Sequence, residues 1–239
     1  MDVSELLARY EARGDEDDFV AARAQFERAI AEAEDARLVT DYGYLLESHA
    51  RNELRQAVAL YERAIELDPD DDRPHYQLIG ARAGLREPER AIELYEQRLA
   101  ASPGSLREQR FLAQAYIAAH AFTRALEIVE AGVAFSPDDA ALIASRGEAK
   151  AGLGDVEGAL TDWRRALQLE PEDIGALYSS AFLLEREHRL QESAEAWQAI
   201  IDWNDARNLT LESEWPRQEL ARLRAKLAGR TGDKDGAAP

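Results

Sequence analysis

A proline returns at a fixed interval through the middle of this 239-residue chain and constrains its fold more than any other feature. Pro69, Pro103, Pro137 and Pro171 follow one another at 34 residues, without an insertion or a gap. Each proline comes after a run with helical spacing, and proline stops helices because it lacks an amide hydrogen and its ring clashes with the preceding turn. A strict period of this length predicts a chain built of repeated supersecondary units.

The residues before each proline repeat as well. An alanine lies twelve residues before each of them, and an aromatic residue lies eight residues before three of the four. Steps of three and four residues return to one face of a helix. The first half of each period has the same helical spacing, as in LREQRFLAQAYIAAH, and a turn such as Gly154-Asp155 separates the halves. Each period therefore predicts a helix–turn–helix with a buried face in its second helix. The alanines are Ala57, Ala91, Ala125 and Ala159, and the aromatic residues are Tyr61, Tyr95 and Trp163, with Val129 as the departure.

This pattern resembles the tetratricopeptide repeat family, whose 34-residue unit carries W-x2-L-G-x2-Y, then A-x3-F, then P. The resemblance implies an all-α, right-handed helical-repeat solenoid of about six helix–turn–helix units with a C-terminal capping helix. Leu45 and Ile79 depart from it, since they stand where the family places a small residue. The expected units span residues 3–36, 38–71, 72–105, 106–139, 140–173 and 174–207.

The sequence after the repeats predicts a cap and a tail. A helix is expected over about 212–229, where Leu220, Leu223 and Leu227 are spaced to cover the apolar face that a last repeat leaves open. Residues 230–239 are small and polar, which predicts a disordered tail. The expected organisation is one solenoid domain over 1–229 followed by this tail.

Charge and composition exclude several function classes. The net charge is −18, from 47 acidic and 29 basic residues, so nucleic acid and anionic membranes are poor partners. There is no cysteine, which excludes disulfides and thiolate chemistry. The acidic N-terminal stretch does not resemble a signal peptide, and the apolar runs are too short to span a bilayer. We therefore expect an acidic cytoplasmic protein.

The sequence nominates no catalytic group, metal site or cofactor. The four histidines never pair at helical spacing, and GLGDVEG follows a helix and not the strand that a phosphate-binding loop needs. We therefore expect no enzyme activity, no cofactor and no metal.

The resemblance implies that the first helix of each unit lines a concave wall. Arg and Tyr on that wall suit a protein interface, and small residues around Ala141, Ala144 and Ala151 leave room in its middle. The expected function is a non-catalytic adaptor or scaffold that holds a partner protein or peptide, acidic with apolar anchors. Two alternatives stay open: the arginines only neutralise neighbouring carboxylates, or the chain is a structural protein that self-associates through its repeats or cap. The predicted groove residues are Tyr42, Leu46, Arg73, Tyr76, Arg107, Arg110, Gln114, Tyr178 and Phe182.

Overall fold

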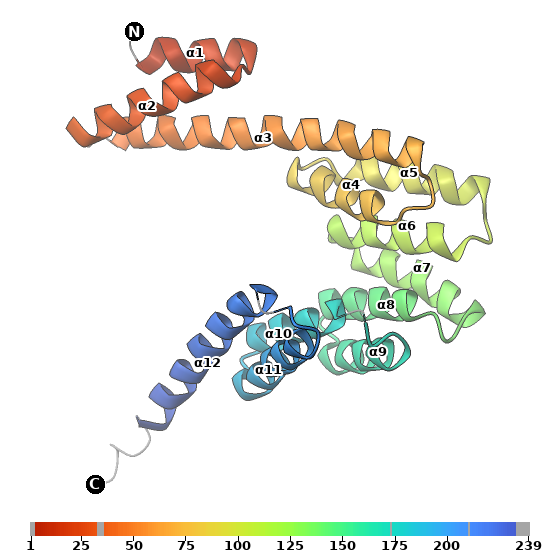
Figure 1. Ribbon diagram of the computed structural model, residues 1–239. Helices are drawn as coiled ribbons and strands as arrows, with labels where there is room; N and C mark the ends of the chain where they lie inside the picture. The colour runs from red at the N-terminus through yellow and green to blue at the C-terminus, as the bar shows by residue number, and fades with distance from the viewer. Residues whose placement is uncertain (1–2, 33–35, 173, 210, 233–239) are drawn as a thin grey trace. The chain divides into compact units, whose positions relative to one another are not determined.

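A computed structural model describes residues 3–32, 36–172, 174–209 and 211–232. Within these ranges the ordered elements are α-helices and one short 3₁₀ helix, without a strand (Figure 1). The prediction of an all-α repeat fold is therefore confirmed. The chain divides into two compact units, Met1–Glu93 and Leu94–Pro239, and each is described by itself.

The first unit contains α1 (Val3–Arg13), α2 (Glu16–Glu32), α3 (Ala36–Leu67) and α4 (Arg73–Gly84). Gly14, at φ +64°, makes the turn between α1 and α2. The core of this end joins buried Tyr10, Phe19, Phe26 and Leu45 from the first three helices. α5 (Pro88–Ala101) begins in this unit and ends in the second.

Helix α3 corrects the prediction for residues 38–71. The repeat pattern predicts a helical hairpin there, but α3 runs unbroken for 32 residues, as Figure 1 shows. The stretch where the turn was expected, His49–Leu54, contains no glycine or proline, but the hairpins at His120 and His188 turn without either residue as well, so this absence alone does not explain the unbroken helix. The hairpin prediction for this one unit is wrong.

The second unit is a succession of paired helices. Each helix packs against the next from α6 to α9, and α10 packs on both α9 and α11. A 3₁₀ turn, η1 (Leu211–Ser213), then leads into α12 (Glu214–Gly232). The paired helices are α6 (Leu106–Ala118), α7 (Phe122–Phe135), α8 (Ala140–Leu153), α9 (Val156–Leu169), α10 (Gly175–Arg186) and α11 (Leu190–Ala206).

The turns inside the hairpins share one geometry. Residues spaced by 34 adopt the left-handed conformation at Arg86, His120, Gly154 and His188. In each case the next amide donates to the carbonyl five residues before it, as Asp155 does to Lys150 at 2.9 Å. This is the hydrogen bond of a Schellman motif, which satisfies a carbonyl at the helix end.

The repeating prolines and alanines lie largely where the pattern predicts. α3, α5, α7 and α9 end two residues before Pro69, Pro103, Pro137 and Pro171. Ala91, Ala125 and Ala159 are buried, with exposed fractions of 1%, 0% and 0%. Ala57, on the unbroken helix α3, is only half-buried.

The cap packs as expected but has different bounds. Leu220 and Leu223 of α12 are buried in one cluster with Trp197 of α11, and Leu227 packs against it. The cap was expected at 212–229; α12 begins at Glu214 and continues to Gly232, so the first three residues of the predicted tail are helical. Residues 233–239 lie outside the described residues.

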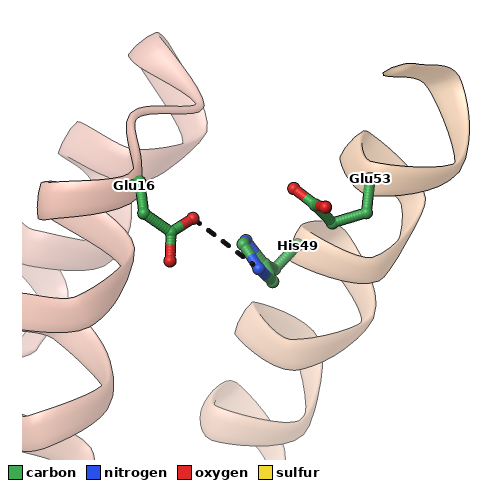
Figure 2. Close-up of side chains that lie close together, drawn as sticks. All are labelled: Glu16, His49 and Glu53. Atoms are coloured by element: carbon green, nitrogen blue, oxygen red, sulfur yellow. Dashed lines mark ion pairs between the residues drawn. The ribbon is translucent and has the colours of Figure 1, made fainter. Parts of the chain in front are cut away.

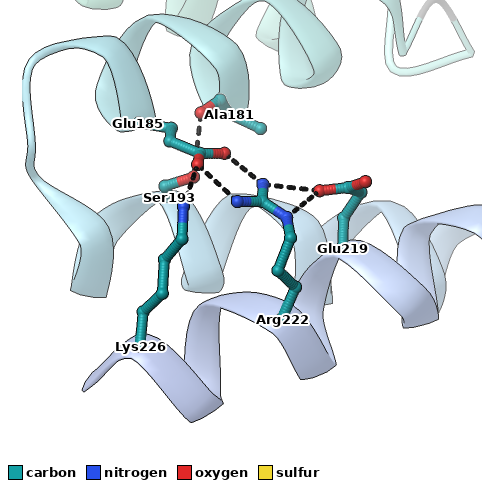
Figure 3. Close-up of polar contacts among 6 residues, drawn as sticks. All are labelled: Ala181, Glu185, Ser193, Glu219, Arg222 and Lys226. Carbon is teal, nitrogen blue, oxygen red and sulfur yellow. Dashed lines mark hydrogen bonds and ion pairs between the residues drawn. The ribbon is translucent and has the colours of Figure 1, made fainter. Parts of the chain in front are cut away.

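Ion pairs also fasten the cap to α10 (Figure 3). Arg222 donates to both carboxylate oxygens of Glu185, at 2.7 and 2.6 Å, and Lys226 donates to one of them at 3.1 Å. Arg222 also pairs with Glu219 of its own helix. The bonds from Arg222 are the main cause that lowers the pKa of Glu185 to about 2, against the opposing effect of partial burial.

Candidate functional site

Three consecutive first helices of the second unit line an open hollow of about 360 Å³. Ile117 of α6, Glu148 and Ala151 of α8, and Phe182 of α10 contribute to its lining. α6 packs against α8, and α8 against α10. The hollow is therefore built by equivalent helices from successive repeats, on the wall that the family resemblance assigns to partner binding.

Hydrogen bonds hold these three helices together. The amide of Gln114 on α6 donates to Ser145 Oγ at 3.1 Å and to Glu148 Oε2 at 3.0 Å, both on α8. Arg186 of α10 donates to the carbonyl of Ala151 at 3.0 Å. Gln114, a predicted groove residue, thus has a positioning role, because it fixes the Glu148 carboxylate at the edge of the hollow.

Glycines bring aromatic rings up to the same wall. A Cβ built on Gly147 would lie 2.6 Å from Trp163 Nε1, and one on Gly152 would lie 2.3 Å from the Phe122 ring. The Trp163 indole uses the space to donate to the carbonyl of Ala144 at 3.1 Å. Trp163 and Phe122 both border the hollow, so these two glycines set its depth.

Two predicted arginines lie near the start of α6. The guanidinium carbons of Arg107 and Arg110 lie 5.1 and 5.4 Å from the centre of the buried Phe111 ring. Such cation–π contacts hold a charged group in place. Both side chains are half-buried, so this end of α6 presents two positioned positive charges in a strongly acidic protein.

The predicted aromatic residues of α10 belong to a larger cluster. Tyr178 stacks on Trp215, with ring centres 6.1 Å apart, and Phe182 lies 5.9 Å from the same ring. Phe182 and Trp215 are 50% and 45% exposed. Trp215, at the start of α12, therefore extends this aromatic surface. The position of Trp215 in the sequence did not predict its contact with Tyr178 and Phe182.

The other predicted residues lie in the first unit. Tyr42 donates to Glu27 at 2.9 Å, while Leu46 and Tyr76 are exposed. Arg73 is bonded to Asp71 through its side chain, at 2.7 Å, and through its backbone amide. These bonds lower the pKa of Asp71 to about 2. Arg73 therefore neutralises a neighbour, which is the alternative that the sequence left open.

Among the described residues, one group has the geometry to hold a metal ion (Figure 2). Glu16, His49 and Glu53 offer ligand atoms within 4.8 Å of one another, and His49 Nε2 lies 3.8 Å from Glu16. The imidazole stacks on Phe19 at 3.6 Å and contacts the hydroxyl of Tyr10 at 3.3 Å. Both carboxylates are exposed, and packing on Phe19 accounts for the position of the ring. We therefore interpret this group as surface side chains where α2 and α3 meet, and not as a metal site.

Comparisons with known proteins agree with this architecture. Residues 47–78 match a family model described as TPR repeat, and residues 83–147 match one described as tetratricopeptide repeat. A thermophilic TPR protein of Thermus thermophilus is 23% identical, with a TM-score of 0.54 over 77% of this chain and 95% of that one. A tetratricopeptide repeat protein of Parabacteroides merdae is 13% identical over 95% and 92% of the two chains, with a TM-score of 0.49. No curated protein matches the chain.

The fold, with equivalent helices α6, α8 and α10 side by side along one wall, is that of a helical-repeat protein. The chain contains tetratricopeptide repeats, as its sequence predicts. Repeats of this family generally mediate protein–protein interactions as scaffolds. None of the helices in the described ranges is long and apolar enough to cross a membrane.

Proposed function

We propose that this protein is a non-catalytic adaptor that holds a segment of a partner protein against α6, α8 and α10. The hollow built by three successive repeats is the observation that carries the proposal. An open hollow with an apolar lining suits a side chain of a peptide better than a small molecule, which needs a pocket that buries most of its surface. The cytoplasm stays the proposed location, on the sequence argument alone.

The chemistry of the wall specifies the segment. Ile117, Ala151 and Phe182 offer apolar surface for a bulky anchor. Arg107 and Arg110 precede Ile117 on the same helix by ten and seven residues, or roughly 10–15 Å at 1.5 Å per residue. An extended peptide advances about 3.3 Å per residue. The proposed ligand therefore carries an acidic residue about three to five positions from its apolar anchor.

A displayed peptide library, selected against the whole protein, tests this proposal. We expect the selected peptides to share the acidic residue and the anchor at that spacing. Phe182→Ser should weaken their binding about 10- to 100-fold, as loss of an aromatic anchor does. Phe135→Ser is the matched control, because Phe135 is more exposed and lies outside the hollow. Selected peptides that bind both variants equally well would contradict the proposal.

The acidic contact is tested with Arg107→Gln/Arg110→Gln. Glutamine removes the positive charge and adds none. Glutamate would also introduce a negative charge, and its repulsion of an acidic ligand would be measured together with the loss of the arginine. Because both guanidiniums rest on Phe111, the double variant should also lose about 1–2 kcal/mol of stability. Binding must therefore be measured well below its melting temperature. Weaker binding with a smaller dependence on salt supports the charge contact; unchanged binding assigns these arginines to structure alone.

A further inference from the structure

The unbroken helix α3 removes a contact that the other repeats make internally. Asn52 lies 34 residues before Arg86, at the position of the left-handed turn, yet it is inside α3. In the hairpin of residues 140–173, Gly147 packs against Trp163. The equivalent pair on α3, Leu45 and Tyr61, is separated by 16 residues of straight helix, or about 24 Å. The two halves of α3 cannot cover each other.

The consequence is visible in the burial of the second half of α3. Tyr95, Val129 and Trp163 hold the same repeat position and are at most 3% exposed. Tyr61 and Ala57 are only half-buried. Tyr61 also borders an open hollow of about 570 Å³, together with Ala64 and Leu67.

Exposed apolar side chains continue along the whole helix at one spacing. Val39, Leu46, Leu60 and Leu67 are 45%, 41%, 69% and 70% exposed. Together with the exposed Glu53, which lies midway between Leu46 and Leu60, they form a series with one residue every seven positions. A seven-residue apolar repeat is the pattern by which one helix packs along another. We call these five residues the α3 stripe.

We propose that a second copy of this chain packs along the α3 stripe, with the two α3 helices antiparallel. A second copy is the occupant because the stripe is nearly self-complementary. Four residues after each of its first four members stands a small residue: Gly43, Ala50, Ala57 or Ala64. In an antiparallel pair Leu46 faces Ala57 of the second copy, and Leu60 faces its Gly43. Large side chains then meet small ones on both sides of a two-fold axis.

Glu53 selects the antiparallel arrangement over the parallel one. A parallel pair in register would place Glu53 directly opposite Glu53 of the second copy, and like charges at close range repel. In the antiparallel pair Glu53 faces Ala50 of the second copy, and its aliphatic stem can cover that methyl group while the carboxylate reaches water. The proposal is independent of the peptide groove, because the stripe lies in the first unit and the groove in the second.

Light scattering over a concentration series tests the self-association. The whole chain should approach twice its monomer mass of 26.7 kDa at tens of micromolar. Leu46→Glu/Leu60→Glu should weaken the dimer at least about 100-fold, with helicity unchanged by circular dichroism because both residues are exposed. Phe135→Glu/Leu153→Glu changes two exposed apolar residues outside α3 and should stay dimeric. A monomer at all concentrations, or a dimer that only the control disrupts, would overturn the proposal.

Disulfide trapping tests the orientation, since the chain has no natural cysteine. Leu46→Cys/Ala57→Cys should form covalent dimers on mild oxidation, because these positions face each other in the antiparallel pair. Leu46→Cys alone should form few, because its two copies lie 11 residues apart along the pair, or about 16 Å. Rapid covalent dimerisation of the single variant would show a parallel pair and refute the arrangement.

Discussion

Asp162 offers the sharpest test of how the wall of the groove is held in place. Its carboxylate lies on α9, is 4% exposed and accepts hydrogen bonds from Arg146 Nε and Nη2 of α8, at 2.8 and 2.6 Å. Lys150 Nζ lies 2.7 Å away. We predict that Asp162→Asn, which keeps the shape and removes the charge, destabilises the protein by about 2–3 kcal/mol. Breaking a buried ion pair costs roughly 3–5 kcal/mol, and the value is lowered here because both cations retain contact with water at 25% and 22% exposure.

The pH dependence of this loss follows from the pKa of Asp162. Burial raises that pKa, but the bonds from Arg146 and Lys150 outweigh burial and hold it below its ordinary value. The stabilisation is therefore complete above pH about 4, where an unfolded aspartate is ionised, and is lost as the pH falls through the folded pKa. The difference between Asp162→Asn and the parent should shrink accordingly below pH 4.

Urea denaturation followed by circular dichroism measures the effect at pH 7 and at lower pH. Glu192→Gln is the matched control, because it breaks only the solvent-exposed pair with Arg189 and should leave the free energy of unfolding nearly unchanged. If Asp162→Asn costs no more than this control, the buried ion group does not secure α8 to α9 and the reasoning is refuted.

Three further changes test other parts of the fold. Ala125→Leu should cost about 1–3 kcal/mol in the same denaturation assay, because Ala125 is fully buried in the repeat interface; a neutral result would show that α7 is loosely packed. Leu223→Ala should cost about 2–5 kcal/mol and lower the melting temperature if α12 seals the last repeat, whereas an unchanged melting curve would remove the cap from the stable core. Glu185→Gln should lose about 1 kcal/mol at pH 7, discounted for the exposure of Arg222, and the loss should vanish as the pH falls from about 4 to about 2; a loss that persists at pH 2 would exclude the ion pair as its cause.

The repeat spacing made most of the fold predictable. Proline ends a helix through its own covalent structure, so Pro103, Pro137 and Pro171 locate three helix ends without knowledge of distant contacts. The continuation of helix α3 through Asn52, where the other repeats turn, was less predictable. Asparagine tolerates a left-handed turn but does not require one, so a helix can continue through it.

The site was predictable only at the level of helix faces. Inner positions of the repeat were identified from spacing, but which side chains engage one another depends on their partners. Arg98, at a position where the repeat places a small residue, makes two 2.9 Å hydrogen bonds to the buried Glu108 beyond the next turn. The contact of Trp215 with Tyr178 depends on how η1 and α12 return to α10. Neither contact has a periodic signal in the sequence.

Photo-crosslinking tests the central claim, that the wall of α6, α8 and α10 holds the partner segment, most directly. A selected peptide would carry a photoreactive analogue of its apolar anchor, and mass spectrometry would identify the residues of the protein to which it becomes attached. The account predicts attachment around Ile117, Ala151 and Phe182, and loss of that attachment in excess unlabelled peptide. Attachment confined to residues outside the hollow, such as the exposed Phe135 of α7 or the outer face of α12, would contradict it.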